Sequence, residues 1–101
     1  MIIYNVTLKI IPSIQSEWVE WMRSEHIPDI INTGCFTKAT MLRLLDIDES
    51  EGSTYAVQYQ ATDKNSYDHY ISDHAQQMRQ KAFDKWGDRF IAFRTVMEVV
   101  N

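Results

Sequence analysis

The chain has 101 residues, with 14 acidic and 10 basic side chains, a net charge of −4 and a sequence pI near 5.2. This length predicts one domain spanning residues 1–101. An apolar content of 45% excludes a disordered chain. The acidic balance argues against nucleic acid or an anionic membrane surface as a partner, because both require a positive patch.

The cysteine content and the N-terminal pattern bear on where the protein resides. Cys35 is the only cysteine, so no disulfide can form within the chain, which suits a reducing cytoplasm. The first residues alternate between apolar and polar, whereas a signal peptide is continuously apolar. No apolar run approaches the roughly 20 residues that span a bilayer. We therefore expect a cytoplasmic protein without a membrane segment.

Apolar periodicity predicts a strand and then a helix in the first third of the chain. Residues 2–11 alternate, which is the period of a strand, and after Pro12 the apolar side chains recur at helical spacing. Pro28 disfavours helical geometry in the preceding residue, so we expect this helix to end at residues 25–26. Pro28 then opens a short helical turn that Gly34 closes.

The rest of the chain predicts two strands, a helix and a strand. Residues 35–46 are rich in Thr, Leu and Phe, residues 53–62 alternate again, and the acidic segment between them predicts a hairpin turn. Asp63 is placed to cap a second helix that ends before Gly87. Residues 89–100 are apolar on both faces and predict the last strand. The expected buried stripe of the second helix comprises Tyr67, Ile71, His74, Met78 and Ala82.

This order of elements predicts an α+β ferredoxin-like βαββαβ fold with a four-stranded antiparallel sheet whose helices cover one face. The other face is too apolar in places to lie bare and too polar for a dry core. We therefore expect a homodimer, a dimeric α/β barrel that packs two sheets face to face around a partly wet chamber. The side chains assigned to this face are Asn5, Thr7, Lys9, Met41, Arg43, Leu45, Gln58, Gln60, Phe93, Thr95 and Met97.

Three short segments carry a resemblance to a known family. They are EWVEWM at 17–22, EHIPDI at 25–30 and TGCF at 33–36. The chain resembles, over essentially its whole length, a family of small bacterial proteins known only as a domain of unknown function within the dimeric α/β-barrel superfamily. The resemblance implies the ferredoxin-like fold and leaves the activity open, because the superfamily includes cofactor-independent monooxygenases, haem-degrading monooxygenases, muconolactone isomerases and dehalogenase-like proteins.

The haem-degrading relatives can be compared residue by residue. They typically carry an Asn on the first strand and, on the second helix, a Trp followed further along by a His that ligates iron. Asn5 matches the first position. The other two correspond approximately to Tyr70 and Gln80, and no histidine lies near Gln80. We therefore expect neither haem nor another cofactor.

His26 and Asp29 form the sharpest candidate for catalysis. A histidine titrates near neutral pH, and an acid three residues further on can orient its ring for proton transfer. The alternative is structural: His26 satisfies the last carbonyl groups of the first helix and interacts with its dipole.

On the sheet, Asn5, Arg43, Tyr55 and Gln58 offer hydrogen-bond groups to a ligand, and Arg43 suits a carboxylate. For the polar groups of the open face, hydrogen bonding within a dimer interface is an equally good interpretation. We expect no metal site, although His69 and Asp73 lie four residues apart, because one histidine with carboxylates on an exposed helix is usually solvated.

Three hypotheses about function follow. The leading one is a homodimer that binds a small organic molecule in a chamber at the sheet faces. The second is a cofactor-independent oxygenase or isomerase that uses His26 as acid or base. The third is a purely structural or interaction dimer without activity.

Overall fold

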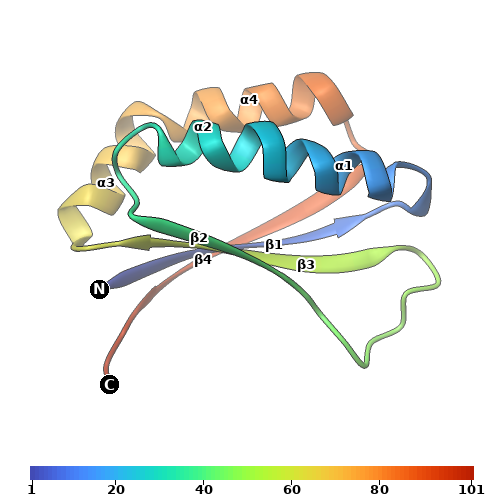
Figure 1. The fold of residues 1–101 in the computed structure, drawn as a ribbon, viewed down its shortest axis with the longest axis horizontal. Helices are drawn as coiled ribbons and strands as arrows, with labels where there is room; N and C mark the ends of the chain where they lie inside the picture. The colour runs from blue at the N-terminus through green and yellow to red at the C-terminus, as the bar shows by residue number, and fades with distance from the viewer.

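In the computed structural model, which describes residues 1–101, four antiparallel strands form one sheet in the order β2-β3-β1-β4, and all helices lie on one of its faces (Figure 1). The strands are β1 (Ile2–Ile10), β2 (Lys38–Arg43), β3 (Ser53–Ala61) and β4 (Phe90–Glu98). This arrangement confirms the predicted α+β ferredoxin-like βαββαβ fold.

The first helical segment runs without a break through η1 (Pro12–Ile14), α1 (Gln15–Trp21), η2 (Met22–His26) and α2 (Ile27–Ile31). The expectation that it ends before Pro28 is wrong. The η2 segment is a turn of π-helix, in which the Ile27 N–H donates a hydrogen bond to the Met22 carbonyl, five residues back. This wider turn gives the proline ring room where an α-helix would bring it against a carbonyl, so the chain stays helical across Pro28.

The second helical segment is broken once. It consists of α3 (Lys64–Asp73) and α4 (Ala75–Trp86), which meet at His74. Asp63 caps α3 as predicted, since its Oδ1 accepts a hydrogen bond from the Ser66 N–H at 2.8 Å. The buried stripe was placed partly wrongly, because Ile71 is exposed and its neighbour Tyr70 lies in the core.

The β2 strand is shorter than expected, and its side chains lie on the opposite faces of the sheet from those predicted. It begins at Lys38, so Cys35 lies in the loop before it. Met41 pairs with Val57 and Arg43 pairs with Tyr55, and these partners belong to the buried face of β3. Lys38, Thr40 and Leu42 therefore occupy the open face, where the sequence analysis placed Met41 and Arg43. A shift of one residue in a strand moves every side chain to the opposite face.

The core lies between the sheet and the helices. The largest fully buried side chains of this core are those of Trp18, Tyr59, Ile10 and Val57. The open face of the sheet instead leaves four large apolar side chains exposed. These are Leu42, Ile91, Phe93 and Met97, whose strand partners place them opposite the helices.

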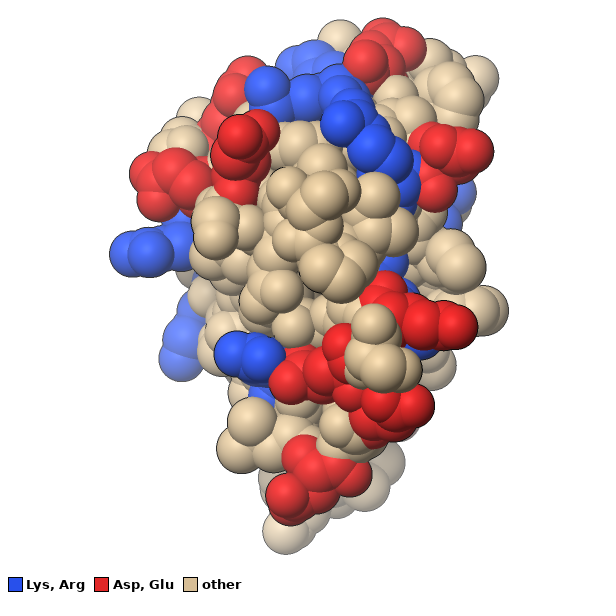
Figure 2. Space-filling view, turned by 90° about the vertical axis from the view of Figure 1, so that its right-hand side faces the viewer, with Lys and Arg blue, Asp and Glu red and all other residues tan.

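The surface charge is mixed on the end of the molecule that Figure 2 presents. Basic side chains form a short band near its upper edge with acidic ones on both sides, and the centre is uncharged. Acidic side chains gather at the lower end, where the loop between β2 and β3 carries Asp46, Asp48, Glu49 and Glu51. None of the helices has the length and apolar character that a membrane crossing requires.

Candidate functional site

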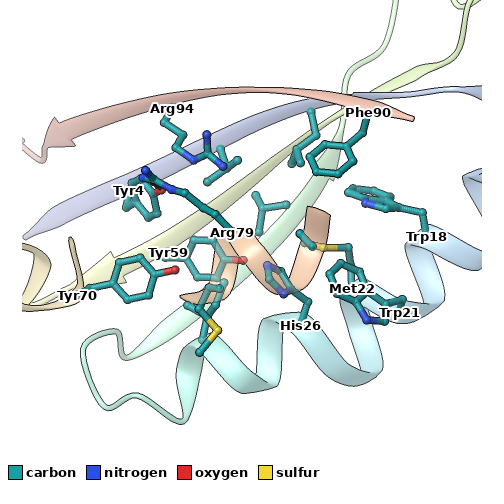
Figure 3. Close-up of a pocket in the computed structure, with 16 residues that line it drawn as sticks. Tyr4, Trp18, Trp21, Met22, His26, Tyr59, Tyr70, Arg79, Phe90 and Arg94 are labelled. Atoms are coloured by element: carbon teal, nitrogen blue, oxygen red, sulfur yellow. Dashed lines mark hydrogen bonds between the residues drawn. The ribbon is translucent and has the colours of Figure 1, made fainter. Parts of the chain in front are cut away.

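A cavity of about 60 Å³ lies between the helices and the sheet (Figure 3). Thirteen of its 16 lining residues are hydrophobic. The volume exceeds the roughly 10–15 Å³ that a single water needs and is smaller than the roughly 150 Å³ of a cavity that accepts benzene. The cavity is on the helix-covered side of the sheet, whereas the sequence analysis expected a chamber at the sheet faces.

His26 is the one ionisable group on the wall that the helices α1 to α2 contribute. Its ring is almost fully buried and stacks on Trp21, and its Nδ1 has no hydrogen-bond partner. Burial lowers the pKa of His26 from 6.5 to about 4, although the nearby Asp29 carboxylate acts in the opposite direction. The imidazole is therefore neutral at physiological pH and able to accept a proton or a hydrogen bond from a ligand.

Asp29 does not hold the His26 ring. Its carboxylate lies 3.8 Å from the Lys81 Nζ of α4 and is 38% exposed. No hydrogen bond joins the Asp29 carboxylate to the His26 ring, whose Nδ1 is without a partner. The predicted pairing of these two side chains is thus replaced by an ion pair between α2 and α4, and a catalytic role for either residue stays a prediction.

Two guanidinium groups lie at the Tyr4 end of the cavity. Arg79 comes from α4 and Arg94 from β4, and both are exposed side chains that line the cavity (Figure 3). Arg79 Nη2 donates a hydrogen bond to the Tyr4 hydroxyl at 3.2 Å. Neither guanidinium pairs with a carboxylate, because the ion pairs of the chain involve other residues. Two positive charges therefore remain available at the mouth of an apolar cavity.

Tyrosines form the wall beside these arginines. The ring of Tyr4 lies 6.0 Å from that of Tyr59 and 5.8 Å from that of Tyr70, measured between centroids. Burial raises the pKa of both Tyr59 and Tyr70 well above the ordinary value for a phenol. Their hydroxyl groups therefore stay protonated and uncharged, and can donate hydrogen bonds to a ligand oxygen.

The four predicted ligand-binding residues do not meet in one place and do not line the cavity. Asn5 and Gln58 are strand partners on the open face, where Asn5 Nδ2 donates to Thr7 Oγ1 at 3.0 Å. Arg43 donates three hydrogen bonds to Glu49, from Nη2 to Oε1 at 2.8 Å and to Oε2 at 3.0 Å, and from Nε to Oε2 at 3.2 Å. The Tyr55 hydroxyl accepts a hydrogen bond from Gln15 Nε2 at 2.9 Å.

Sequence reasoning missed Arg79 and Arg94. In the sequence, Arg79 is one of several basic residues of the last predicted helix, a position typical of side chains that complement a helix dipole, and Arg94 interrupts a strand that is apolar on both faces. A signal for Arg94 does exist, because a charged residue within an apolar strand needs solvent or a partner. Nothing in the sequence pairs it with Arg79, since only the packing of α4 over β4 brings the two together.

The sheet order and the single layer of helices on one face, with a cavity between that layer and the sheet, define an α+β protein of the ferredoxin-like class. Residues 1–100 match the family described as Domain of unknown function (DUF4286), and the chain belongs to this family. No curated protein matches the chain in sequence.

Solved structures of the same fold include three that cover nearly all of the chain. A dimeric ferredoxin-like protein from an uncultured marine organism is 14% identical, with a TM-score of 0.71 over 99% of this chain and 95% of its own. An EthD family protein from Bacillus halodurans is 16% identical, with a TM-score of 0.70 over 99% and 100%. SnoaB, a cofactor-independent oxygenase from Streptomyces nogalater, is 13% identical, with a TM-score of 0.68 over 99% and 94%.

Proposed function

We propose that this protein binds a small, mostly apolar organic anion in the cavity between its sheet and its helices, acting as one domain over residues 1–101. The observation that carries the proposal is the pair of guanidinium groups, Arg79 and Arg94, which border an apolar cavity without carboxylate partners. An apolar pocket with a few convergent polar groups is the usual form of a small-molecule site.

The lining defines the chemistry of the ligand. Aromatic and aliphatic walls favour a flat apolar body, and guanidinium groups bind carboxylate, phenolate or enolate oxygens strongly. The cavity as it stands is small, but Met22 and Met78 are among its walls. Methionine side chains are unbranched and rearrange readily, so these two can make room for a larger ring.

We further propose that the protein is a homodimer formed through the open face of the sheet. The exposed side chains of Leu42, Ile91, Phe93 and Met97 on this face support the proposal, because contiguous apolar surface favours association. Dimeric proteins are also found among the solved structures of the same fold. A cytoplasmic location agrees with the single, buried, free Cys35.

A catalytic function is the second candidate, and the state of His26 favours it. Its neutral imidazole lines the same cavity, where a general base must sit, and an anion formed by proton removal would be held by Arg79 or Arg94. The chain shares its fold with a cofactor-independent oxygenase. In this reading the ligand is a substrate with an acidic C–H or O–H group.

The test uses a matched pair of probes, naphthalene-1-carboxylate and its neutral carboxamide, whose binding is followed by isothermal titration. We expect the carboxylate to bind the native protein more tightly than the amide. Arg79→Gln and Arg94→Gln should each weaken carboxylate binding by roughly tenfold or more, as expected for a lost charged hydrogen bond.

Arg23→Gln is the control, because Arg23 is exposed on η2 and does not line the cavity. Equal affinity for the two probes, or equal losses in all three variants, would refute the anion site. Mass spectrometry of molecules retained by the native protein then identifies the natural ligand. Oxygen uptake on adding that ligand, abolished by His26→Gln, distinguishes the enzyme from the binding protein.

A further inference from the structure

A second cluster of chemically reactive side chains lies outside the cavity. Cys35 in the loop between α2 and β2, His69 in α3 and His74 at the break between α3 and α4 each place a ligand atom within 4.8 Å of those of the other two. Figure 1 shows that this loop passes beside α3. Cys35 is distant in the sequence from the two histidines, and only the tertiary fold brings it to them.

The backbone at His74 contributes directly to this arrangement. In an unbroken helix, His74 would be rotated by about 140° from His69, because each residue adds about 100°. At His74 the backbone leaves helical geometry, with φ −129° and ψ −30°, and the two imidazole centroids are 5.5 Å apart. The break contains neither glycine nor proline. The interruption of the helix therefore has a local consequence, the approach of two histidine rings.

A carboxylate lies beside one of these rings. Asp73 Oδ2 lies 3.3 Å from the Nδ1 of His69, and the Ser72 hydroxyl donates a hydrogen bond to the other Asp73 oxygen at 2.8 Å. The other ring nitrogen of His69 is left free for a ligand. A carboxylate on the far nitrogen is the outer partner that metal-bound histidines usually have, and it increases the basicity of the ligating nitrogen.

We propose that Cys35, His69 and His74 bind a zinc ion. One thiolate and two imidazoles form a donor set that zinc prefers, and three protein ligands leave a fourth position open to water or to an added ligand. Bond lengths of about 2.0–2.3 Å place tetrahedral ligands roughly 3.5 Å apart, so binding draws the three side chains inward by about 1 Å. A shallow groove lined by Gly34, Asp63 and Ser66 reaches Cys35 and His69 and gives the ion access.

The proposed site is coupled to the organic-ligand cavity through one residue. The ring of Tyr70 stacks on His74, with centroids 6.3 Å apart, and Tyr70 also lines the cavity. A metal ion that holds the His74 ring in place therefore also restricts the Tyr70 ring, which forms part of the cavity wall. The metal site does not depend on the proposed organic ligand, because none of its three ligating residues lines the cavity.

The experiment titrates the purified metal-free protein with Zn²⁺ in competition with a chromogenic chelator, and with Co²⁺ as a spectroscopic substitute. We expect one ion per chain, a near-ultraviolet thiolate-to-cobalt band, and the visible bands of a tetrahedral cobalt centre. Cys35→Ser should abolish the thiolate band. His69→Gln and His74→Gln should each weaken Zn²⁺ binding by at least tenfold, and Asp73→Asn by roughly tenfold.

His26→Gln is the matched control, since His26 is the remaining histidine and lies outside the cluster, so its Zn²⁺ affinity should equal that of the native chain. Circular dichroism of each variant shows whether the fold is intact. If a variant of a ligating residue fails to fold, the Zn²⁺ affinity of Asp73→Asn is used to test the proposal instead, because Asp73 is exposed and is not a ligand. Absence of the thiolate band in the native protein, or an equal loss of affinity in His26→Gln, would overturn the proposal.

Discussion

The imidazole of His26 stacks on the indole of Trp21, with ring centroids 4.5 Å apart and planes inclined by 20°. Trp21 is the last residue of α1 and His26 the last residue of η2, the turn of π-helix that follows, in which residues five apart share a backbone hydrogen bond. Burial keeps the imidazole neutral at physiological pH, and the buried ring lines the cavity. The same local geometry therefore controls both the charge of His26 and its access to a ligand.

The pKa of His26 predicts how stability changes with pH. Its value of about 4 in the folded protein lies below the ordinary 6.5, so between these values the unfolded chain binds a proton that the folded chain does not. The free energy of unfolding should therefore fall as the pH drops through this window, by about 2 kcal/mol between about pH 7 and about pH 5. Urea unfolding of the native chain and of His26→Gln measures the difference, which should be much smaller in the variant. Parallel pH curves for the two proteins would show that the pKa of His26 is the same in the folded and the unfolded chain.

The open face of the sheet predicts an interface that a single charge disrupts. Phe93, on β4, is 66% exposed and should be covered by a second copy, whereas Phe83, on α4, is 58% exposed and lies on the helical side. We expect Phe93→Glu to dissociate the dimer, because a buried unpaired carboxylate is costly, and Phe83→Glu to leave it intact. Sedimentation velocity at micromolar concentration measures the mass. A native monomer, or dissociation by Phe83→Glu alone, would place the contact elsewhere.

The position of the cavity predicts that the fold tolerates a larger side chain at Ala82 but not at Ala75. Ala82 lines the cavity, whereas Ala75 is buried in contact with the rest of the core. Ala82→Leu should fill empty space and leave the melting temperature within a few degrees while abolishing ligand retention. Ala75→Leu should destabilise the fold by about 1–3 kcal/mol through overpacking. Thermal unfolding together with mass spectrometry measures both effects, and a large destabilisation by Ala82→Leu would mean that the cavity is not free space.

Two glycines with positive φ should differ in their tolerance of alanine. A Cβ at Gly52 would overlap the backbone carbonyl of Ile10, whereas one at Gly34 would meet nothing within 4 Å. Gly34→Ala carries only the conformational cost of a left-handed residue, about 1–2 kcal/mol. Gly52→Ala should cost clearly more, because it forces apart the ends of β1 and β3. Chemical denaturation of both variants tests the order, and equal costs would contradict it.

Much of the fold could be predicted from the sequence, because the burial of one face of a helix or strand imposes a regular spacing on its apolar residues. Strict alternation in β1 and β3 identified both strands and their buried faces, and Asp63 identified the start of α3. The β2 strand was harder, because the apolar residues in it and just after it, Met41, Leu42 and Leu44, do not alternate strictly. Its face is decided by hydrogen-bond register with β3, which is a property of two segments together.

The candidate sites could be predicted from the sequence only in part. The sequence by itself determined that His26 is a residue of interest, because a histidine beside Pro28 at the end of an apolar stripe is chemically distinctive. It did not determine what surrounds the ring, since the helix continues through Pro28 by a π-turn and packs the ring among buried side chains such as Trp21 and Met22. Only the tertiary structure brought Arg79 to Arg94, and Cys35 to His69 and His74. The reason is physical: periodicity along one element reports which side of it is buried, whereas a binding site is assembled from elements whose mutual positions are fixed by packing.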